Sequence, residues 1–571
     1  MKSNWSLKPA APFDFADYLK TIESEERQRP LLLSQNKLIS QLLYNRGLTE
    51  EATIQAFLSP DYDQHVHDPL LFKNMPKAVE RVRKALATGE RIHVFTDYDA
   101  DGICGATVLS EFFRQVNANF SVSMPHRLTE TYGLTMEKIE DFFKQGITLL
   151  ITVDCGVTDY KEIEYAEEHG MNVIVVDHHL VPPKWPPAFA IVDHKQEDET
   201  YPEHVLSGAG LAFKLVAALV ATGDFSVTRD QIKWLLDVVA IAAVADMVPL
   251  KGENRVFVTY GLRVMRKLRR QGLAALLHVS GISASQITEE TIGFTIAPRI
   301  NAASRMDHPR MALDLLLADH PLEARRQAEH LDKKNSERKF ETEKIFTDLE
   351  TRFRGRELPP VIFEGSESWS AGVVGLAANR FMEKYQRPVF LYALKETIAK
   401  GSCRAPMGLN IVELMREATH HFDDFGGHES AGGFSFTPDK RPSLENFFGT
   451  ITNLTFEPQL LYIEGELTLA DCSKDVFSAL RLLAPFGQDN PSPKFLLKHV
   501  PVAEVKKLGS SGEHIKLFLG DEKIPAIFFR AGLYTKTLTK GQKVDAVVEL
   551  VENTWKGRTT IELRVLDLDP A

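Results

Sequence analysis

Short apolar runs, each followed directly by an aspartate, are the most regular feature of the first half of the chain. The three clearest runs are residues 92–96, 149–153 and 173–176. Apolar runs of this length, bounded by turn residues, predict strands that are buried on both faces. Helical patterns separate the runs, for example at residues 138–144 and 161–169. This alternation predicts an α/β fold with a doubly wound, mainly parallel sheet, in a first domain at about residues 76–320.

The residues that follow these strands carry the candidate chemistry. Asp97, Asp99 and Asp101 come directly after the first run and share one loop. Three carboxylates in one loop repel one another at neutral pH unless cations lie among them, so divalent ions with oxygen ligands are their natural partners. Ligand sites in open α/β sheets form at the carboxyl ends of the strands, which brings Asp154 and the triplet at 177–179 to the same crevice. A solvated acidic turn is the alternative for the first loop alone, but three converging strand ends favour a metal centre.

The other segments predict further domains. Residues 1–75 mix short helical patterns with a loop and predict an N-terminal cap on the first domain, while the apolar run 235–245 fits either a helix or a strand. Residues 321–355 are densely charged and have alanines and leucines at helical spacing, which predicts a long connecting helix. A second, smaller α/β domain follows at 356–455, and short alternating runs at 456–571 predict a small closed barrel of the oligonucleotide-binding (OB) type, with a generic β-sandwich as the alternative.

Composition and charge restrict the function classes. A chain of 571 residues is too long for one hydrophobic core, which agrees with several domains. No apolar run is long enough to cross a bilayer and the first residues do not lead into a signal-peptide core, so we expect a cytoplasmic protein with no membrane contact. Four scattered cysteines suit reduced thiols and argue against structural zinc. The net charge of −11 means that only local basic clusters can bind phosphates.

An ordered set of motifs then gives a resemblance that covers nearly the whole chain. The motifs are Asp97-Tyr98-Asp99-Ala100-Asp101-Gly102, Val153-Asp154-Cys155-Gly156, Asp177-His178-His179, Ala245-Asp246-Met247-Val248-Pro249-Leu250, Ala297-Pro298-Arg299-Ile300-Asn301, Lys400-Gly401-Ser402-Cys403-Arg404, Phe425-Gly426-Gly427-His428 and Pro485-Phe486-Gly487-Gln488-Asp489-Asn490-Pro491. With these motifs in one order, the chain resembles the DHH phosphoesterase superfamily and, within it, the single-strand-specific 5′→3′ DNA exonucleases. The resemblance implies a DHH domain, a DHHA1-type second domain and a C-terminal OB-like barrel.

The resemblance also implies a centre of two metal ions, Mn²⁺ or Mg²⁺. Asp97 would bind the first ion, Asp99, His178 and Asp246 would bind the second, and Asp154 would bridge them. Two close ions bridged by a carboxylate suit the hydrolysis of a phosphodiester, in agreement with the interpretation of the acidic loops.

Two histidines and one aspartate complete the implied centre. His179 would face the scissile phosphate, and Asp177 would orient the histidines. His93 lies four residues before Asp97, a spacing similar to the His-x-x-x-Asp of related DHH pyrophosphatases. It either completes the shell of the first metal or packs on the sheet as a neutral imidazole, and the sequence leaves both open.

A set of basic and polar residues would hold the phosphates of the substrate. The matching positions are Arg127, Arg299, Arg305, Ser402, Arg404 and His428. The planar fork of arginine binds a phosphate with two hydrogen bonds, and glycine turns let backbone N–H groups approach the same oxygens. A surface salt bridge is the alternative for each single arginine. On the barrel, the candidate strand-binding residues are Lys506, Lys507, Lys516, Phe528, Phe529, Arg530, Trp555, Lys556 and Arg558.

The function implied is a metal-dependent exonuclease that degrades single-stranded DNA 5′→3′ to nucleoside 5′-monophosphates in recombination and repair. A helicase and a single-strand-binding protein are the implied protein partners. One alternative is a phosphodiesterase for oligoribonucleotides or cyclic dinucleotides, which the extra C-terminal domain disfavours. The other alternative is a non-catalytic DNA-binding scaffold, which the presence of all the candidate ligands disfavours.

Overall fold

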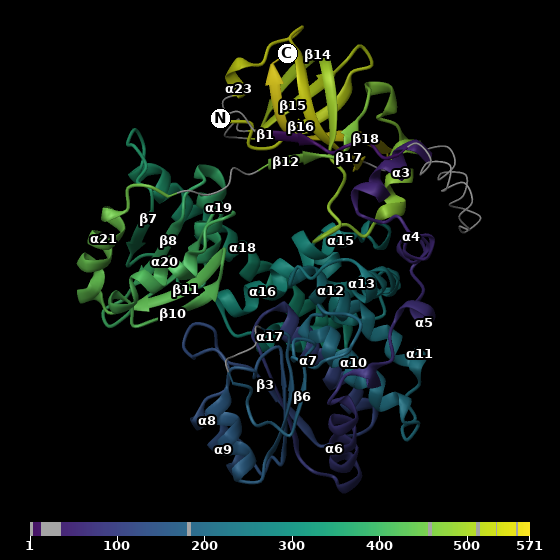
Figure 1. Ribbon diagram of the computed structural model, residues 1–571, viewed down its shortest axis with the longest axis vertical. Helices are drawn as coiled ribbons and strands as arrows, with labels where there is room; N and C mark the ends of the chain where they lie inside the picture. Colours follow the sequence, from purple (N-terminus) through teal and green to yellow (C-terminus); the bar gives the residue numbers. More distant parts are fainter. Residues whose placement is uncertain are drawn as a thin grey trace. The chain divides into compact units, whose positions relative to one another are not determined.

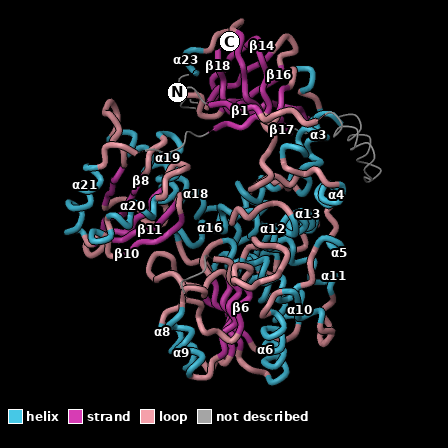
Figure 2. The backbone as a smooth tube through the Cα atoms, viewed as in Figure 1, coloured by secondary structure: helices cyan, strands magenta, loops and turns pink. Residues whose placement is uncertain are grey.

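The computed structural model describes residues 4–12, 36–179, 184–454, 460–509, 514–532, 534–555 and 558–570, and its helices and strands are labelled in Figure 1. The chain divides into two compact units. The barrel unit comprises Met1–Val66, Pro249–Thr259 and Gln459–Ala571, and the larger unit comprises His67–Val248 and Tyr260–Pro458. Figure 2 shows that the strands fall into separate sheets with helices around them.

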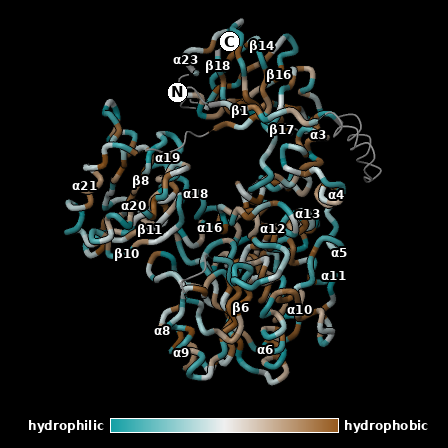
Figure 3. Tube along the Cα trace, in the orientation of Figure 1, coloured by the Kyte–Doolittle hydropathy of each residue, from teal (hydrophilic) through white to brown (hydrophobic). Residues whose placement is uncertain are grey.

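A five-stranded parallel sheet forms the centre of the first domain in the larger unit. Its strand order is β3-β2-β4-β5-β6, and every neighbouring pair is parallel. The strands are β2 (Ile92–Thr96), β3 (Phe120–Ser123), β4 (Leu149–Val153), β5 (Asn172–Val176) and β6 (Ala190–Val192). The apolar runs of the sequence are the inner strands β2, β4 and β5, which are almost entirely buried and are coloured mainly as hydrophobic in Figure 3. The predicted parallel α/β sheet is therefore confirmed.

Helices cover both faces of this sheet. One face packs against α8 (Met136–Lys144) and α9 (Tyr160–Glu168) in a single hydrophobic cluster. The second layer consists of α6 (Met75–Thr88), α7 (Ala100–Gln115) and α10 (Gly208–Ala221); α10 contacts both other helices, and all three contact strands of the sheet. Parallel sheets require cover on both faces, because their strands are apolar throughout.

The ambiguous run after residue 235 is a helix, α12 (Leu236–Ala245). Nearly all of its side chains are buried against α7 and α10, so it is apolar on every side and shows no helical stripe. The predicted connecting helix is α18 (Pro321–Arg352). The remaining described helices of this region are α11 (Arg229–Ile232), α14 (Gln271–Val279), α15 (Glu289–Thr291), the π-helical turn η4 (Ile292–Ile296), α16 (Ala297–Met306), α17 (Arg310–Leu316) and the short turns η1 (Pro69–Leu71), η2 (Lys233–Leu235) and η3 (Ala284–Gln286). The helix α13 (Gly252–Met265) begins in the barrel unit and ends in the larger unit.

A second α/β domain follows α18 in the same unit. Its sheet has the order β10-β11-β9-β8-β7 and mixes parallel and antiparallel pairs. The strands are β7 (Ile362–Ser366), β8 (Val389–Leu394), β9 (Ala399–Arg404), β10 (Asp424–His428) and β11 (Ala431–Phe436), and the helices are α19 (Val374–Tyr385), α20 (Ile411–Glu417), α21 (Arg441–Thr450), η5 (Thr419–His421) and η6 (Pro438–Lys440). This agrees with the smaller α/β domain that the sequence predicts.

The barrel unit contains a closed β-barrel. The strand order β14-β15-β16-β18-β17 closes because β17 also pairs with β14. The elements are β13 (Gly465–Glu466), β14 (Phe495–Leu508), β15 (His514–Leu519), β16 (Ile524–Phe528), β17 (Lys543–Trp555), β18 (Arg558–Pro570), α22 (Lys474–Leu480), α23 (Tyr534–Thr537), η7 (Leu469–Asp471) and η8 (Arg481–Leu483). The closure confirms the predicted barrel over the β-sandwich.

The N-terminal helices differ from the expected cap on the first domain. Ile39, Leu42 and Leu43 of α3 (Asn36–Asn45), with Ile54 and Phe57 of α4 (Glu51–Leu58), share one hydrophobic cluster with the barrel strands. The strand β1 (Asn4–Leu7) likewise pairs with β12 (Leu460–Ile463), and α5 (Tyr62–His65) completes the segment. The apolar faces of these helices therefore pack on a core that lies more than 400 residues later in the chain. The other predicted domain boundaries stay predictions.

Across the described part of the chain, no helix is both long enough and apolar enough to cross a membrane.

Candidate metal centre and phosphate-binding cluster

The carboxyl ends of three parallel strands supply most of the candidate metal ligands. Asp97 follows β2, Asp154 follows β4, and the triplet Asp177-His178-His179 follows β5. Asp154 has a φ of 61°, in the left-handed region that few side chains adopt. A Cβ on Gly208 would lie 2.8 Å from the Cβ of Asp154, so glycine is needed where α10 approaches this turn.

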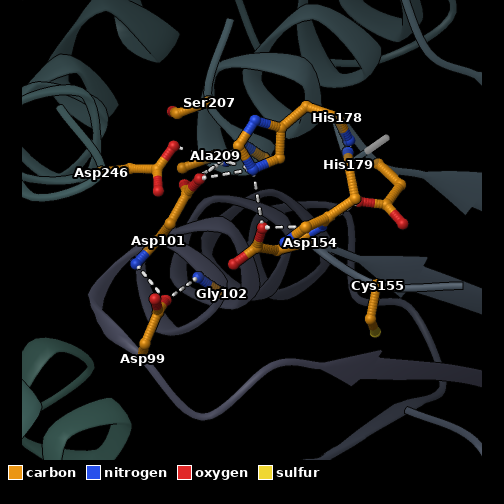
Figure 4. Close-up of polar contacts among 12 residues, drawn as sticks. Asp99, Asp101, Gly102, Asp154, Cys155, His178, His179, Ser207, Ala209 and Asp246 are labelled. Carbon is orange, nitrogen blue, oxygen red and sulfur yellow. Dashed lines mark hydrogen bonds and ion pairs between the residues drawn. The ribbon is translucent and has the colours of Figure 1, made fainter. Parts of the chain in front are cut away.

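The side chains converge as the sequence predicts (Figure 4). The Nε2 atom of His178 lies 3.0 Å from Oδ1 of Asp154, 3.6 Å from Oδ2 of Asp101 and 3.7 Å from Oδ2 of Asp246. Three groups have ligand atoms within 4.8 Å of one another. They are Asp97, Asp99 and Asp154; Asp101, His178 and Asp246; and Asp154, His178 and His179. Asp154 and His178 are shared between groups, so the groups form one continuous site.

Asp101 is one of the three carboxylates in the acidic loop, but the resemblance gave it no place among the metal ligands. Its carboxylate accepts the backbone N–H groups of Gly208 and Ala209, both at 2.7 Å, and so binds the free N–H groups at the start of α10. The structure groups Asp101 with His178 and Asp246, whereas Asp99, expected in that place, is grouped with Asp97 and Asp154. One oxygen of Asp99 caps α7, because it accepts the N–H groups of Asp101 and Gly102.

Electrostatics favour a cation at this site. Burial raises the pKa of Asp97 and of Asp154 well above the usual range, and neighbouring carboxylates raise both further. The same two causes raise the pKa of Asp101 to about 7 and that of Asp246 to about 8. The buried Oδ1 atom of Asp97 has no hydrogen-bond partner in the described part of the chain. Clustered carboxylates with an unpaired oxygen fit hard divalent ions such as Mn²⁺ or Mg²⁺.

The two histidines of the triplet have different protonation states. Burial lowers the pKa of His178 to about 3, so its imidazole is neutral and can bind a metal. Burial also lowers the pKa of His179, but a 2.8 Å hydrogen bond from Nδ1 to Oδ1 of Asp177 outweighs it and raises this pKa to about 9. Burial raises the pKa of Asp177, but its bonds to His179 leave this pKa below the usual value. Asp177 thus orients His179, as the resemblance implies.

His93 lies outside these ligand groups. Its Nδ1 atom lies 2.8 Å from the hydroxyl of Ser121, and its Nε2 atom lies 2.7 Å from the hydroxyl of Ser123. The side chain is buried, and burial lowers its pKa to about 4. Both ring nitrogens therefore have partners on the neighbouring strand β3, which favours the packed imidazole over the metal ligand.

Several arginines gather beside the metal centre. Burial lowers the pKa of Arg305 to about 9, and the charges of Arg127, Arg338 and Arg404 lower it further. Within the described residues, none of these four forms an ion pair with a carboxylate. The Nη1 atom of Arg305 donates to the carbonyl of Gly372 at 3.1 Å. Asp99 also acts on Arg305, but no carboxylate pairs with these guanidinium groups within the described residues, so together they form a site for an anion.

Ser402 lies beside Arg404 on β9, at the start of helix α19. A Cβ on Gly375 would lie 3.1 Å from Oγ of Ser402 and 3.4 Å from Nη2 of Arg404. Ser402 and Arg404 thus lie side by side against the first turn of α19, in which the N–H groups of Val374 and Leu376 already bond to carbonyls. His428 is exposed at the end of β10, and burial together with the charges of His179 and Lys195 lowers its pKa.

Arg299 differs from the other predicted phosphate ligands. Its Nη2 and Nε atoms lie 2.8 Å and 2.9 Å from Oδ1 of Asp332, and its Nη1 atom donates to the carbonyl of Thr295. The salt-bridge alternative therefore describes Arg299 in this structure.

Three further residues of the site carried no clear sequence signal. The hydroxyl of Tyr132 donates to the carbonyl of Asp154 at 3.1 Å, and its ring centre lies 6.1 Å from that of His179. The ammonium group of Lys195 donates to the carbonyl of His178. Arg338 has a buried Nε atom without a hydrogen-bond partner among the described residues. Only Tyr132 could have been suspected, because it lies in the same loop as Arg127.

Comparisons with known proteins agree with this architecture. Residues 91–243 match the model of the DHH family N-terminal domain, residues 358–452 match the DHHA1 domain, and residues 463–567 match the RecJ OB domain. The fold and the site thus define a DHH phosphoesterase with DHHA1 and OB domains.

Whole-chain relatives narrow this class. The chain is 32% identical to the single-stranded-DNA-specific exonuclease RecJ of Escherichia coli, over 86% of this chain and 90% of that protein. It is also 32% identical to the exonuclease RecJ of Bacillus subtilis, over 93% of this chain and 67% of that protein. A crystal structure of RecJ from Thermus thermophilus in complex with Mn²⁺ matches with a TM-score of 0.81 and 27% identity, over 100% of this chain and 80% of that one. The chain belongs to the RecJ family.

Proposed function

We propose that this protein is a metal-dependent exonuclease that degrades single-stranded DNA 5′→3′ and releases nucleoside 5′-monophosphates. The observation that carries this proposal is the site itself: carboxylates and histidines from three strand ends and the end of α12 lie within ligand distance of one another. Arg127, Arg305, Arg338 and Arg404 lie beside them and form no ion pair with a carboxylate among the described residues. A metal centre next to an anion site suits the cleavage of a phosphodiester near a further phosphate.

Two ion positions are proposed. Asp97, Asp99 and Asp154 would hold one ion, while His178 and Asp246 would hold the other and share Asp154 with the first. Mn²⁺ or Mg²⁺ suits this donor set, because oxygen ligands dominate and the one histidine is neutral. Such ions, when bound, lower the pKa of water and neutralise charge on the reacting phosphate.

The remaining residues of the site orient and bind. Asp101 would hold the start of α10 against the loop of Asp97 and Asp99, through its hydrogen bonds to Gly208 and Ala209. His179, held by Asp177, would donate a hydrogen bond to an oxygen of the scissile phosphate. Tyr132 would help to position the turn at Asp154 through its bond to the carbonyl of that residue.

Phosphates of the substrate would bind beside α19. We assign the terminal 5′-phosphate to Arg305, Ser402 and Arg404, because Ser402 and Arg404 lie side by side against α19 and Arg305 bonds to the carbonyl of Gly372 just before that helix. Arg127 and His428 would contact neighbouring phosphates. Arg299 would contribute less, since it is already bound to Asp332.

We propose that the protein acts in the cytoplasm, in the recombination and repair of DNA. A helicase and a single-strand-binding protein would act with it. This setting follows from membership of the RecJ family and from the need of such an enzyme for strands that have already been separated.

The experiment uses strands labelled at either end, in Mn²⁺. A 5′→3′ exonuclease releases a 5′ label at once as a mononucleotide but keeps a 3′ label in gradually shortening strands. Chelation of the metal should stop both reactions, and Asp154→Asn serves as the inactive control. Cleavage of dinucleotides with no cleavage of longer strands would support the small-substrate phosphodiesterase instead. Binding of strands without any cleavage would support the non-catalytic scaffold.

A further inference from the structure

Two large apolar side chains are exposed near the end of α12, one directly after Asp246 and one in the turn η4, which packs on this helix. Phe294 is 79% exposed and Met247 is 66% exposed, among the highest values for large apolar residues in the described chain. Single exposed apolar residues need no explanation. These two, however, lie on segments that meet at α12, and Met247 keeps a backbone conformation that has a cost.

Met247 occupies a backbone position that favours glycine. The N–H of Val248 bonds to the carbonyl of Ala243 at 3.1 Å, and the N–H of Met247 bonds to that of Val244 at 3.3 Å. These two bonds form a Schellman motif at the end of α12, with Met247 at its left-handed position, φ 56°. Glycine is the usual residue there, because any Cβ is strained at positive φ. The protein therefore keeps a strained and exposed methionine directly after Asp246.

Phe294 is held rigidly by the turn that carries it. It lies in the π-helical turn η4, between Ile292 and Ile296, which are both fully buried. A Cβ on Gly293 would lie 3.7 Å from Cγ1 of Val244, so the turn packs on the last turn of α12. Single π-helical turns inside helices are frequent at functional sites.

The helix that follows this turn, α16, forms a hydrogen bond to the loop that carries Asp97 and Asp99. Asn301 on α16 accepts the N–H of Ala100 at 2.9 Å, next to Asp99. The turn with Phe294 therefore packs on α12, which ends at Asp246, and leads into a helix that is bonded to the loop of Asp99.

We infer that Phe294 and Met247 form a base-binding shelf, on which nucleobases of the substrate strand stack beside the metal centre. The inference rests on the proposed function and adds a contact to the bases, whereas the arginine cluster contacts only phosphates. An aromatic ring and a polarisable thioether bind the flat face of any base, without regard to sequence. A duplex buries these base faces in its own stack, so the shelf would also favour unpaired strands.

The test compares two substrates of equal length, an ordinary strand and one whose first nucleotides at the 5′ end are stable abasic sites. Phe294→Ala should raise KM about tenfold on the ordinary strand with little change in kcat, since one stacked base is lost. On the abasic strand the variant and the wild type should have equal KM, because no base is there to stack. Phe294→Tyr, which keeps the ring, should behave as the wild type on both.

Phe340→Ala is the matched control, since it removes a ring that is 68% exposed on α18. It should leave KM unchanged on both strands. An equal rise in KM for Phe294→Ala on both strands, or no rise on either, would overturn the shelf. A wild-type protein that cleaves neither strand in Mn²⁺ would instead refute the proposed function.

Met247→Gly gives an independent measurement. Glycine relieves the backbone strain, so the midpoint of thermal unfolding should rise by roughly 1–3 °C, while KM on the ordinary strand rises several-fold. Opposite changes in stability and substrate binding are the signature of a residue kept for function. A fall in the unfolding midpoint, or an unchanged KM, would remove Met247 from the shelf.

Discussion

Arg404→Ala should impair the cleavage of 5′-phosphorylated strands more than that of 5′-hydroxyl strands. Nη1 of Arg404 donates to the carbonyl of Cys403 at 2.7 Å, which fixes the guanidinium beside Ser402 and the start of α19. A charge-assisted hydrogen bond contributes about 1.5–3 kcal/mol, which corresponds to roughly 10–150-fold in kcat/KM. Arg305 and Arg127 remain nearby in the variant, so we expect the lower end of this range, about tenfold.

The assay measures kcat/KM on both strands in excess Mn²⁺. Arg404→Lys keeps the charge but loses the planar fork, so its loss should lie between those of the wild type and the alanine variant. Arg299→Ala is the matched control, since Asp332 already binds that guanidinium, and it should cause a smaller loss that is equal on the two strands. Burial lowers the pKa of Arg404, so the folded state disfavours this charge and its removal should not lower the unfolding midpoint. Equal losses of kcat/KM on both strands would assign Arg404 to an internal phosphate. They would refute its assignment to the terminal 5′-phosphate.

Three further predictions test other parts of the site. Asp154→Asn should lower turnover more than 100-fold. It should also raise the unfolding midpoint of the metal-free protein, because burial and neighbouring carboxylates disfavour the charge of Asp154 in the folded state. Asparagine is chosen because it tolerates the φ of 61° better than alanine does. A midpoint that falls in the absence of metal would contradict this. His93→Ala should leave the Mn²⁺ concentration for half-maximal activity unchanged and lower the unfolding midpoint, since its ring bonds to Ser121 and Ser123; a higher Mn²⁺ requirement would make it a metal ligand. Phe529→Ala should weaken the binding of long strands more than that of short ones, because this ring is 55% exposed on the barrel, and equal affinities would contradict a strand-binding barrel.

Local patterns were enough to bring together most of the candidate metal ligands, although Asp246 was placed only by the resemblance. Asp97, Asp154 and His178 follow strands whose apolar runs are visible in the sequence, and the ends of parallel strands meet at one edge. The class of the fold could be predicted for the same reason, since strand and helix periods alternate along the chain. In each case the evidence lies within a few residues of the feature.

Features that depend on distant partners could not be predicted. Asp101 bonds to Gly208 and Ala209, more than 100 residues later, and nothing near it in the sequence indicates this. Arg299 and Asp332 lie on two different helices and are 33 residues apart in the sequence. Their ion pair occupies a guanidinium that the sequence predicted to bind phosphate. The N-terminal helices were assigned to the nearer domain, because an amphipathic pattern shows that a face is buried but not what covers it.

The barrel shows a further limit of prediction from sequence. At the end of β16, two neighbouring residues face opposite sides of the barrel wall. Phe528 is 7% exposed and fills the barrel core, whereas Phe529 is 55% exposed. The sequence named both as strand-binding candidates, because only the register separates them. Lys556 and the side chain of Trp555, two further candidates, lie outside the described residues.

Two candidate strand-binding lysines of the barrel already form ion pairs, which affects how the barrel would bind single-stranded DNA. Lys506 lies 2.9 Å from Glu504, and Lys516 lies 3.1 Å from Glu562. A phosphate that approaches either lysine must compete with a carboxylate already in place, so these cations release few counterions on binding DNA. Exposed rings such as Phe529 carry no such competitor. Stacking on such rings should therefore contribute more to strand binding than Lys506 and Lys516 do, and much of the salt dependence of binding should arise from the arginines around Arg305, whose charged neighbours include other guanidinium groups.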